Sequence, residues 1–328
     1  MDLINVFETA LRSAFGVQAA AYALLAIGLN VHYGYTGLLN FGQVGFMLVG
    51  AYGLGISVAV FGWSLWVGIF VGLGAAVVLA LILGAPTLRL RADYFAITTI
   101  AVAEVLRLVV RSSAATELTG GPFGLQAIAG EFYAVNPLSV GMRLGPLRYP
   151  TNVTWSLVVT WMLVLLCTLV VTLLMRSPWG RVLRAIREDE DAARSLGKNA
   201  FGYKMQSLVL GGVIGGLAGV MFAIAGSTVN ADAFRPQVTF YAYVILILGG
   251  AATRIGPIAG TIIFWFLFSG IQSLVRQGQA ENLLPGPFGD AVAVGGSALI
   301  ITGLGLMLLV VYRPQGIFGN TRELVLHV

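Results

Sequence analysis

Long apolar runs follow one another along most of this chain, and only short polar stretches separate them. Eight of these runs approach or exceed the ~20 residues with which an α-helix crosses a bilayer. They span residues 15–31, 38–61, 65–85, 94–110, 155–175, 207–225, 258–275 and 291–311. A shorter run at 240–252 predicts a broken or half helix. The pattern predicts an all-α, polytopic helical membrane protein with about 8–10 transmembrane segments, because backbone in lipid must satisfy its hydrogen bonds internally.

The composition agrees with this membrane assignment. Hydrophobic residues make up 58% of the chain and charged residues only 10%, whereas soluble domains carry about 25% charged residues. No stretch has the composition of a separate soluble domain, so we expect a single transmembrane domain over residues 1–328. The first run follows neither a basic leader nor a small-residue cleavage site, and we expect it to stay in the mature protein.

Basic residues concentrate in the segment 176–204, which holds seven of the nineteen in the chain. Because loops rich in Lys and Arg stay in the cytoplasm, we expect a cytoplasmic loop at 176–206 and an extracytoplasmic loop at 112–152. Other arginines fit the cytoplasmic side, namely Arg89, Arg91, Arg254, Arg313 and Arg322. The segment 276–290 then lies outside, and the side of the N-terminus stays open. This topology accounts for the net charge of +5, so no nucleic-acid partner is expected.

Glycine is concentrated at 34–55, 211–226 and 249–260. Small residues let membrane helices approach closely, and packing explains a single glycine on its own. Polar residues and helix breakers at membrane depth need a cavity or burial in protein. We therefore expect a translocation path beside two interrupted segments, TGLLNFGQVGF (36–46) and GGAATRIGPIAG (249–260), where Gly256-Pro257 breaks the second. The candidate path residues in them are Asn40, Gln43, Gly249, Gly250 and Pro257.

Two ionisable residues lie inside an apolar run. Glu104 and Arg107 are three residues apart and therefore share one helix face, where each offsets the desolvation of the other. Two interpretations stay open. Either the pair only steadies the span near its outer end, or it lies beside the translocation path, and both residues remain path candidates.

Residues that carry enzymatic or metal chemistry are scarce. His32 and His327 have no ligand spacing to a carboxylate or to Cys167, the single cysteine, so neither a metal site nor an intrachain disulfide is expected. A phosphate-binding loop needs Gly-Lys-Ser/Thr after a glycine-rich stretch, and the nearest match, at 197–199, lacks the hydroxyl residue. We expect no catalytic residue, no metal and no cofactor bound by this chain.

The charged segment has the features of a helix outside the membrane. Ser177 is placed as an N-cap, Pro178 as the first helical residue and Gly197 as a left-handed stop. Charge pairs four residues apart support the helix. These are Arg184 with Glu188, Arg187 with Asp191 and Glu190 with Arg194. A narrow apolar stripe accompanies them, formed by Val182, Ile186, Ala193 and Leu196. Such a helix suits a groove on another protein, and the alternative is a solvated connector.

At this point the sequence resembles a known family. Asp191-Ala192-Ala193 followed by Gly197 looks like the EAA-x3-G loop of ABC importer permeases, with Asp in place of Glu. Nearly the whole chain is similar to the permeases of bacterial branched-chain amino acid importers, and most closely to the LivM-type subunit. The similarity rests on motifs in the same order, namely TGLLNFGQVGFMLVGAY, ADYFAITTIAVAEVLRL, LTGGPFGL, RAIREDEDAARSLGKN, LGGAATRIGPIAG and YRPQGIFG.

This resemblance implies the translocation subunit of an ABC importer for branched-chain, aliphatic amino acids in the bacterial inner membrane. The implied partners are a second homologous permease, two cytoplasmic ATPase subunits that hold ATP and Mg, a periplasmic substrate-binding protein and the lipid bilayer. The EAA-like loop would be the coupling helix that docks on an ATPase. Its implied coupling residues are Arg184, Arg187, Glu190, Asp191, Ala192, Ala193 and Gly197.

Other functions stay open on the sequence alone. Urea and amide importers use similar permeases, so the substrate is an expectation. A secondary transporter or channel is the alternative of a different class, but only Glu104 and Arg107 would be available inside the runs for ion coupling. A membrane-embedded enzyme would need clustered His, Asp or Glu.

Overall fold

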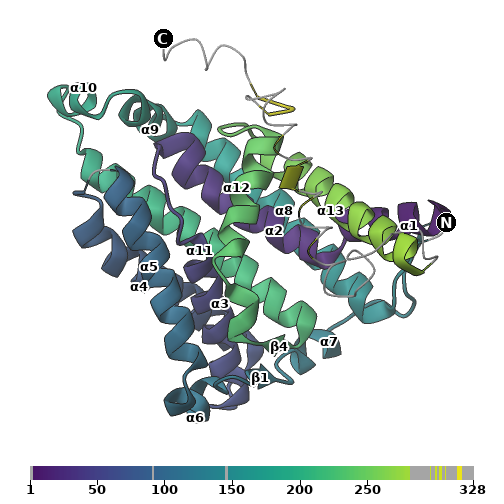
Figure 1. Cartoon of the computed structure of the whole chain (residues 1–328). Helices are drawn as coiled ribbons and strands as arrows, with labels where there is room; N and C mark the ends of the chain where they lie inside the picture. The colour runs from purple at the N-terminus through teal and green to yellow at the C-terminus, as the bar shows by residue number, and fades with distance from the viewer. Residues whose placement is uncertain are drawn as a thin grey trace.

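The computed structural model describes residues 3–90, 92–144, 147–280 and 316–319, together with the single residues 296, 300, 303, 304 and 307. Helices dominate this part of the chain (Figure 1). The α-helices are α1 (Leu3–Ala14), α2 (Val17–Leu29), α3 (Gln43–Ala59), α4 (Leu65–Thr87), α5 (Ala92–Arg111), α6 (Thr116–Thr119), α7 (Gly130–Ala134), α8 (Thr151–Arg176), α9 (Pro178–Glu188), α10 (Glu190–Ser195), α11 (Ala200–Gly226), α12 (Gln237–Gly249) and α13 (Gly256–Ala280). The all-α prediction is confirmed.

Shorter elements complete the described part. A π-helix, η1 (Asn30–Tyr35), continues α2, and two 3-10 helices are η2 (Ser113–Ala115) and η3 (Ala231–Phe234). Two antiparallel ribbons pair β1 (Leu125–Gln126) with β4 (Thr228–Val229) and β2 (Arg143–Leu144) with β3 (Leu147–Arg148). The β1–β4 ribbon joins the loop before α8 to the end of α11.

Four of the described helices, α4, α8, α11 and α13, are long and apolar enough to cross a membrane. A fifth span results if α1 and the continuous α2–η1 helix, bent by 44° relative to each other, count as one. α5 coincides with the predicted run 94–110 but carries more charge, and α3 and α12 are apolar and shorter. Each predicted run up to residue 275 is largely helical, and the run 291–311 lies outside the continuously described residues.

The amphipathic helix α1 is an element that the apolar runs did not predict. Phe7 meets Phe266 of α13 edge to face, with ring centroids 5.8 Å apart, and Ser13 Oγ lies 2.8 Å from Ser269 Oγ. Its buried residues are Val6, Ala10 and Ala14. Because α1 is amphipathic rather than continuously apolar, a search for continuous apolar runs misses it.

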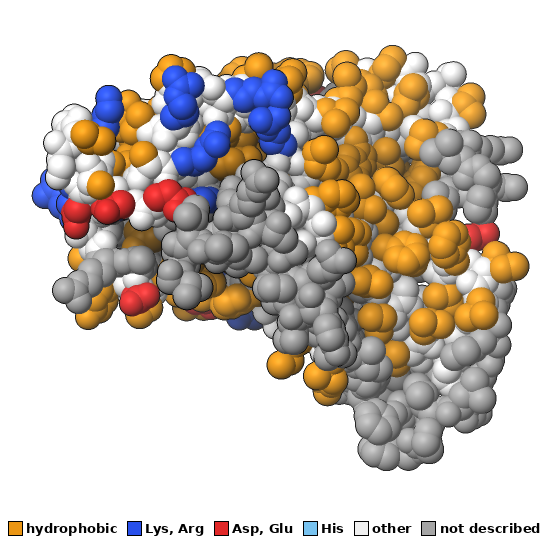
Figure 2. All heavy atoms as spheres, turned by 90° about the horizontal axis from the view of Figure 1, so that it is seen from above, with side chains coloured by type: hydrophobic (Ala, Val, Ile, Leu, Met, Phe, Trp, Pro, Cys, Tyr) orange, Lys and Arg blue, Asp and Glu red, His pale blue; other side chains and the backbone are white. Residues whose placement is uncertain are grey.

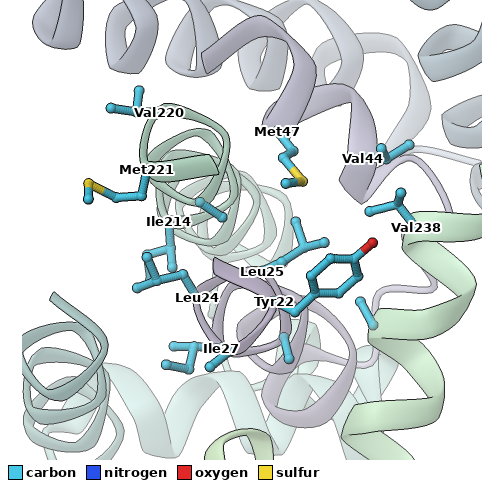
Figure 3. Packing of buried hydrophobic residues seen from close by; sticks show 14 of the residues in the cluster. Tyr22, Leu24, Leu25, Ile27, Val44, Met47, Ile214, Val220, Met221 and Val238 are labelled. Carbon is cyan, nitrogen blue, oxygen red and sulfur yellow. The ribbon is translucent and has the colours of Figure 1, made fainter. Parts of the chain in front are cut away.

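Helix α2 lies at the centre of the core. All of its residues from Ala19 to Leu29 are buried. Figure 3 shows its side chains between Ile214 of α11, Met47 of α3 and Val238 of α12. Helix α2 is apolar on every side, and the other helices rather than lipid enclose it.

Close contact between α2 and α11 depends on glycine. A Cβ on Gly28 of α2 would lie 2.5 Å from the Gly211 oxygen of α11 and 2.8 Å from Gln43 Nε2. No side chain fits at this distance, so the two backbones can meet only because both positions are glycine.

The bundle has two ends, which the helices connect (Figure 1). At one end, which we call the α9 end, Arg89 lies over the Phe201 ring at 5.5 Å, and Arg254 and Arg184 line one pocket. The opposite end, which we call the β1 end, holds the β1–β4 ribbon and the described part of the loop, 112–144 and 147–150. Helix α2 starts near Tyr149 of this loop.

The two predicted groups of loops lie at opposite ends of the bundle, and which end faces the cytoplasm stays a prediction. Arg89, Arg254 and the segment 176–206 share the α9 end, while residues 112–144 lie at the β1 end. Figure 2 shows the α9 end, with Lys and Arg gathered on the side of α9 and α10 and hydrophobic side chains on the side of α1 and α13. Some residues that the sequence assigned to one side of the membrane lie outside the described part, namely Arg91, Arg313, Arg322 and 281–290.

Candidate functional site

The predicted break in the second apolar run is present. After η1 and Thr36 the chain leaves the helix over residues 37–42, and α3 begins only at Gln43. Gly37 adopts a left-handed conformation, with φ of +74°, which glycine reaches without a steric penalty. The polar residues of this segment therefore lie at a helix interruption in the middle of the bundle.

Three side chains form a buried cluster at this interruption. Asn40 Nδ2 donates to Gln43 Oε1 at 3.1 Å and lies 3.0 Å from His32 Nδ1. Gln43 Nε2 donates to the Gly211 oxygen at 3.1 Å, and His32 Nε2 lies 3.1 Å from the Leu208 oxygen. We call His32, Asn40 and Gln43 the amide–imidazole cluster.

The cluster has one consistent assignment of protons. Since the Asn40 amide nitrogen donates, His32 Nδ1 must accept and His32 Nε2 must carry the proton that it donates to Leu208. Asn40 Oδ1 accepts from the Gly42 N–H at 2.9 Å. All three side chains are fully buried, with an exposed fraction of 0%. Every member is thus held by directional bonds in a medium where an unpaired polar group is costly.

The sequence placed Asn40 and Gln43 beside a path. In this conformation both side chains point at His32 and at the α11 backbone, and whether they line a path in another conformation stays a prediction. The role of His32 was not predicted, because its spacing to other residues fits neither a metal site nor a catalytic one. The available signal was an imidazole in an apolar run eight residues before Asn40.

Threonines from two other helices complete the break. Thr99 Oγ1 of α5 accepts from the Phe41 N–H at 3.1 Å, and Thr239 Oγ1 of α12 accepts from the Val44 N–H at 3.0 Å. The Phe41 ring lies against Tyr243, with centroids 4.8 Å apart. The start of α12 is therefore joined directly to the start of α3.

The short run at 240–252 forms the predicted half helix. α12 has 13 residues, which gives a length of about 20 Å, less than the ~30 Å of a bilayer core. It ends at Gly249, and Gly250 follows with φ of +102°. The Ile317 and Phe318 N–H groups donate to the Leu248 and Gly249 oxygens at 2.9 and 3.2 Å, so residues far along the chain complete its C-terminal hydrogen bonds.

The second interruption lies slightly earlier than predicted. Residues 250–255 are not helical, and Pro257 is the second residue of α13, where a missing N–H costs nothing. Asn30 of η1 bridges to this loop twice: its Nδ2 donates to the Thr253 oxygen, and its Oδ1 accepts from the Ala252 N–H, both at 2.9 Å. The end of the α2–η1 helix is thereby tied to the end of α12.

Glu104 and Arg107 form the predicted pair, with Arg107 Nε donating to Glu104 Oε2 at 2.9 Å. The pair is extended by Asp232 of η3, which the sequence did not indicate. Asp232 Oδ1 lies 3.5 Å from Arg107, 3.6 Å from Arg111 and 3.4 Å from Arg235. This group of three arginines and two carboxylates links α5 to η3 near the β1 end.

The charged segment forms two helices rather than the single one expected. Asp189 is extended, with φ of −153°, and its Oδ1 accepts from the Ala192 N–H at 2.9 Å, so it caps the start of α10. The predicted stop at Gly197 is present: its φ is +76°, and the Lys198 N–H donates to the Ala193 oxygen at 3.1 Å. Ser177 precedes Pro178 as expected, but its side chain makes no cap.

The predicted coupling residues divide between two faces. Arg184 and Arg187 bond to the rest of the protein: Arg184, although exposed, donates to the Met175 oxygen at 2.7 Å, and the half-buried Arg187 donates to the Gly34 oxygen at 2.6 Å. Ala193 is buried, and Glu190 is bonded to Lys204 of α11 and, at 2.7 Å, to Arg194. These residues hold the two helices against the bundle.

The other coupling residues are exposed around residues 191–197, which we call the coupling tip. Asp191, Ala192 and Gly197 lie on its surface. Leu196 is 80% exposed, although the predicted stripe placed it with Val182, Ile186 and Ala193, which pack inward. An isolated exposed leucine beside charged residues is suited to a pocket on a partner protein.

Comparison with known proteins identifies the family. Residues 12–293 match the family described as branched-chain amino acid transport system, permease component. The chain is 31% identical to the high-affinity branched-chain amino acid transport system permease protein LivM of Escherichia coli (strain K12), over 92% of this chain and 68% of that protein. It therefore belongs to the branched-chain amino acid transport permease family, as a multi-pass permease component of an ABC system in the inner membrane.

More distant relatives show the range of the family. A probable branched-chain amino acid transport permease protein LivM of Methanocaldococcus jannaschii is 27% identical over 74% of this chain and 76% of that protein. The guanosine ABC transporter permease protein NupQ of Bacillus subtilis (strain 168) is 24% identical over 81% of this chain and 82% of that protein.

Proposed function

We propose that this permease moves branched-chain, aliphatic amino acids across the membrane and is driven by ATPase subunits acting on α9 and α10. The 31% identity to LivM supports this substrate class. In this proposal the α9 end faces the cytoplasm and the β1 end faces the periplasm. The partners are a second homologous permease, two ATPase subunits that hold ATP and Mg, and a periplasmic substrate-binding protein. The chain itself carries out no catalysis and binds no cofactor.

A continuous series of contacts from the coupling tip to the helix break carries the proposal. The tip continues into α9, where Arg187 donates to the Gly34 oxygen of η1 and packs beside Gly37. Gly37 leads within three residues to Asn40 of the amide–imidazole cluster. A movement of α9 by an ATPase would thus act on the backbone between Gly34 and Asn40. Through Gln43 of the cluster, this movement would reach α11.

The path is proposed along the outer face of α12. Its less buried residues follow a three- and four-residue spacing, and they are Gln237, Phe240, Tyr241, Val244 and Ile247. This stripe is mainly apolar and aromatic. Such a surface suits contact with the aliphatic side chain of the transported amino acid and with a second permease that faces α12. At its outer end lies the group described above, whose three arginines (Arg107, Arg111 and Arg235) and two carboxylates (Glu104 and Asp232) give a net charge of +1. This charge favours the approach of a carboxylate.

The remaining path candidates act at the two ends of the break. Asn40 and Gln43 hold the inner part closed in the conformation described, and they become accessible when the amide–imidazole cluster opens. Gly249, Gly250 and Pro257 shape the turn on which α12 pivots. Neutral amides can hydrogen-bond a zwitterion and release it again, whereas an isolated fixed charge would trap it.

Two substitutions separate docking from transmission. In the reconstituted complex, Leu196→Glu should weaken ATPase binding, because a charge replaces the exposed apolar side chain. Arg187→Gln should leave ATPase binding intact and lower leucine uptake per ATP hydrolysed by about tenfold, since a charged hydrogen bond to Gly34 is lost. Arg181, exposed on the same helix, provides the control Arg181→Gln.

Three measurements decide the outcome: ATPase co-purification, ATP hydrolysis and uptake of leucine, valine, urea and guanosine. Unchanged uptake per ATP in Arg187→Gln would contradict the transmission role. Faster uptake of urea or guanosine than of the aliphatic amino acids would overturn the proposed substrate.

The path assignment has its own test. In a Cys167→Ala background, cysteines at positions 40 and 43 should be inert to small water-soluble thiol reagents in the conformation described, where both positions are fully buried. They should react in a nucleotide state that opens the path. Inert cysteines in every nucleotide state would mean that the amide–imidazole cluster serves packing alone.

A further inference from the structure

A pocket at the α9 end lies beside the contact of Arg184 with the Met175 oxygen, and neither the proposed coupling nor the proposed path assigns it an occupant. It has a volume of about 370 Å³ and lies where the end of α8, the helix α9 and the loop 250–255 meet. Arg184 and Arg254 line it together with the apolar side chains of Met175, Ile255 and Phe318. Its size falls in the range of pockets that bind small molecules or head groups.

The pocket is positively charged. Arg184 uses one N–H for the Met175 oxygen, and its guanidinium has further donors. Arg254 is exposed, and no Asp or Glu is among the described residues that line the pocket. Two arginines without a lining carboxylate form a site for an anion that accepts several hydrogen bonds, and phosphate oxygens fit guanidinium groups best.

Exposed apolar surface adjoins these charges. Ile255 is 63% exposed and Phe318 53%. Hydrocarbon contact directly beside an anion site at the end of a membrane helix is what a phospholipid requires, whereas a soluble anion needs only the charged part.

We propose that this pocket binds the phosphate of an anionic phospholipid from the leaflet at the α9 end. The acyl chains contact Ile255 and Phe318, and the phosphate bridges Arg184 of α9 to Arg254 of the α12–α13 loop. Anionic head groups bind in basic pockets between membrane helices in this way. The lipid would hold α9 against the second helix interruption and so tie the coupling segment to the membrane.

Native mass spectrometry of the purified full-length chain tests the proposal, with phosphatidylglycerol and phosphatidylcholine as probes. The wild type should bind phosphatidylglycerol at least about tenfold more tightly than phosphatidylcholine. Two guanidinium groups contact the phosphate, and only phosphatidylglycerol has a net negative charge, because the choline cation neutralises the phosphate of phosphatidylcholine. Arg254→Gln should remove most of this preference, and Arg254→Lys should keep part of it. Arg181→Gln removes an equal charge from α9 outside the pocket and should change binding by less than about twofold.

Several results would overturn the assignment. Equal binding of the two lipids, or equal effects of Arg254→Gln and Arg181→Gln, would show that the pocket is not a lipid site. Displacement of phosphatidylglycerol by millimolar inorganic phosphate would identify a soluble anion as the occupant instead. Because Arg254 is exposed, its variants should keep the wild-type melting temperature. If Arg254→Gln changes the melting temperature, the lipid preference of Arg254→Lys decides whether the pocket binds the phosphate.

Discussion

Residues 37–42 before α3 and residues 250–255 before α13 both interrupt an apolar segment, but different interactions hold them. The first interruption is fixed mainly by side chains, through the fully buried amide–imidazole cluster, with a close backbone contact of Gly42 at the Thr99 oxygen. The second is fixed mainly by backbone contact, because a Cβ on Gly249 would overlap the Gly256 oxygen, and by the double bridge from Asn30.

This difference indicates which interruption can move. A side-chain cluster has two arrangements available, since each amide or imidazole can exchange its protein partner for water when a path opens. Two backbones in contact through glycine have no such alternative. We therefore expect the first interruption to switch during transport and the second to act as a fixed pivot, with Asn30 as the link between them.

The largest effect should come from the backbone contact. Gly249→Ala places a methyl group against the Gly256 oxygen and should cost about 3 kcal/mol or more of unfolding free energy. Gly74→Ala is the control, since nothing lies within 4 Å of its added Cβ, and should change stability by less than about 1 kcal/mol. Unfolding of the purified proteins in mixed micelles measures both. Equal stability of the two variants would show that the second interruption is not fixed by close contact.

The amide–imidazole cluster should give a smaller but coupled effect. Asn40→Ala leaves His32 Nδ1, Gln43 Oε1 and the Gly42 N–H without their partner, at a cost of about 1–3 kcal/mol. His32→Ala should cost a similar amount, and the double variant should be more stable than the sum predicts by at least about 0.5 kcal/mol. Strict additivity in this cycle would mean that the cluster does not act as a unit.

The bridge between the interruptions should have the smallest effect. Asn30→Ala removes two hydrogen bonds to backbone groups and should cost about 1–2 kcal/mol. Since Asn30 and Asn40 share no partner, their substitutions should add to within about 0.5 kcal/mol. A larger deviation would show that the two interruptions move together, and the distinction between switch and pivot would then fail.

The sequence predicted those parts of the site that depend on local signals. The interrupted run before Gln43, the half helix α12 and the stop at Gly197 follow from hydrophobic spacing and from glycine at positions that need a left-handed backbone. The pairing of Glu104 with Arg107 also follows from helix geometry.

The missed parts depend on contacts between distant residues. Asp232 reaches Arg107 across 125 positions, and the partners of His32 include Leu208, 176 positions away. The break at Asp189 was missed because charge pairs suggested one continuous helix, whereas its side chain caps a new one. Packing against α11 and η1 likewise decides which coupling residues face outward. The spacing of residues within the segment contains no information about this packing.

The backbone bonds from residues 317 and 318 to the end of α12 have a consequence for biosynthesis. The ribosome adds these residues about 70 positions after α12, which takes roughly 4 to 14 seconds at ordinary elongation rates. Until then the last carbonyls of α12 lack these donors, and in lipid each such group carries a penalty of several kcal/mol. The half helix can thus reach its final position only after the later segment has been made, so insertion of α12 is completed late and out of chain order.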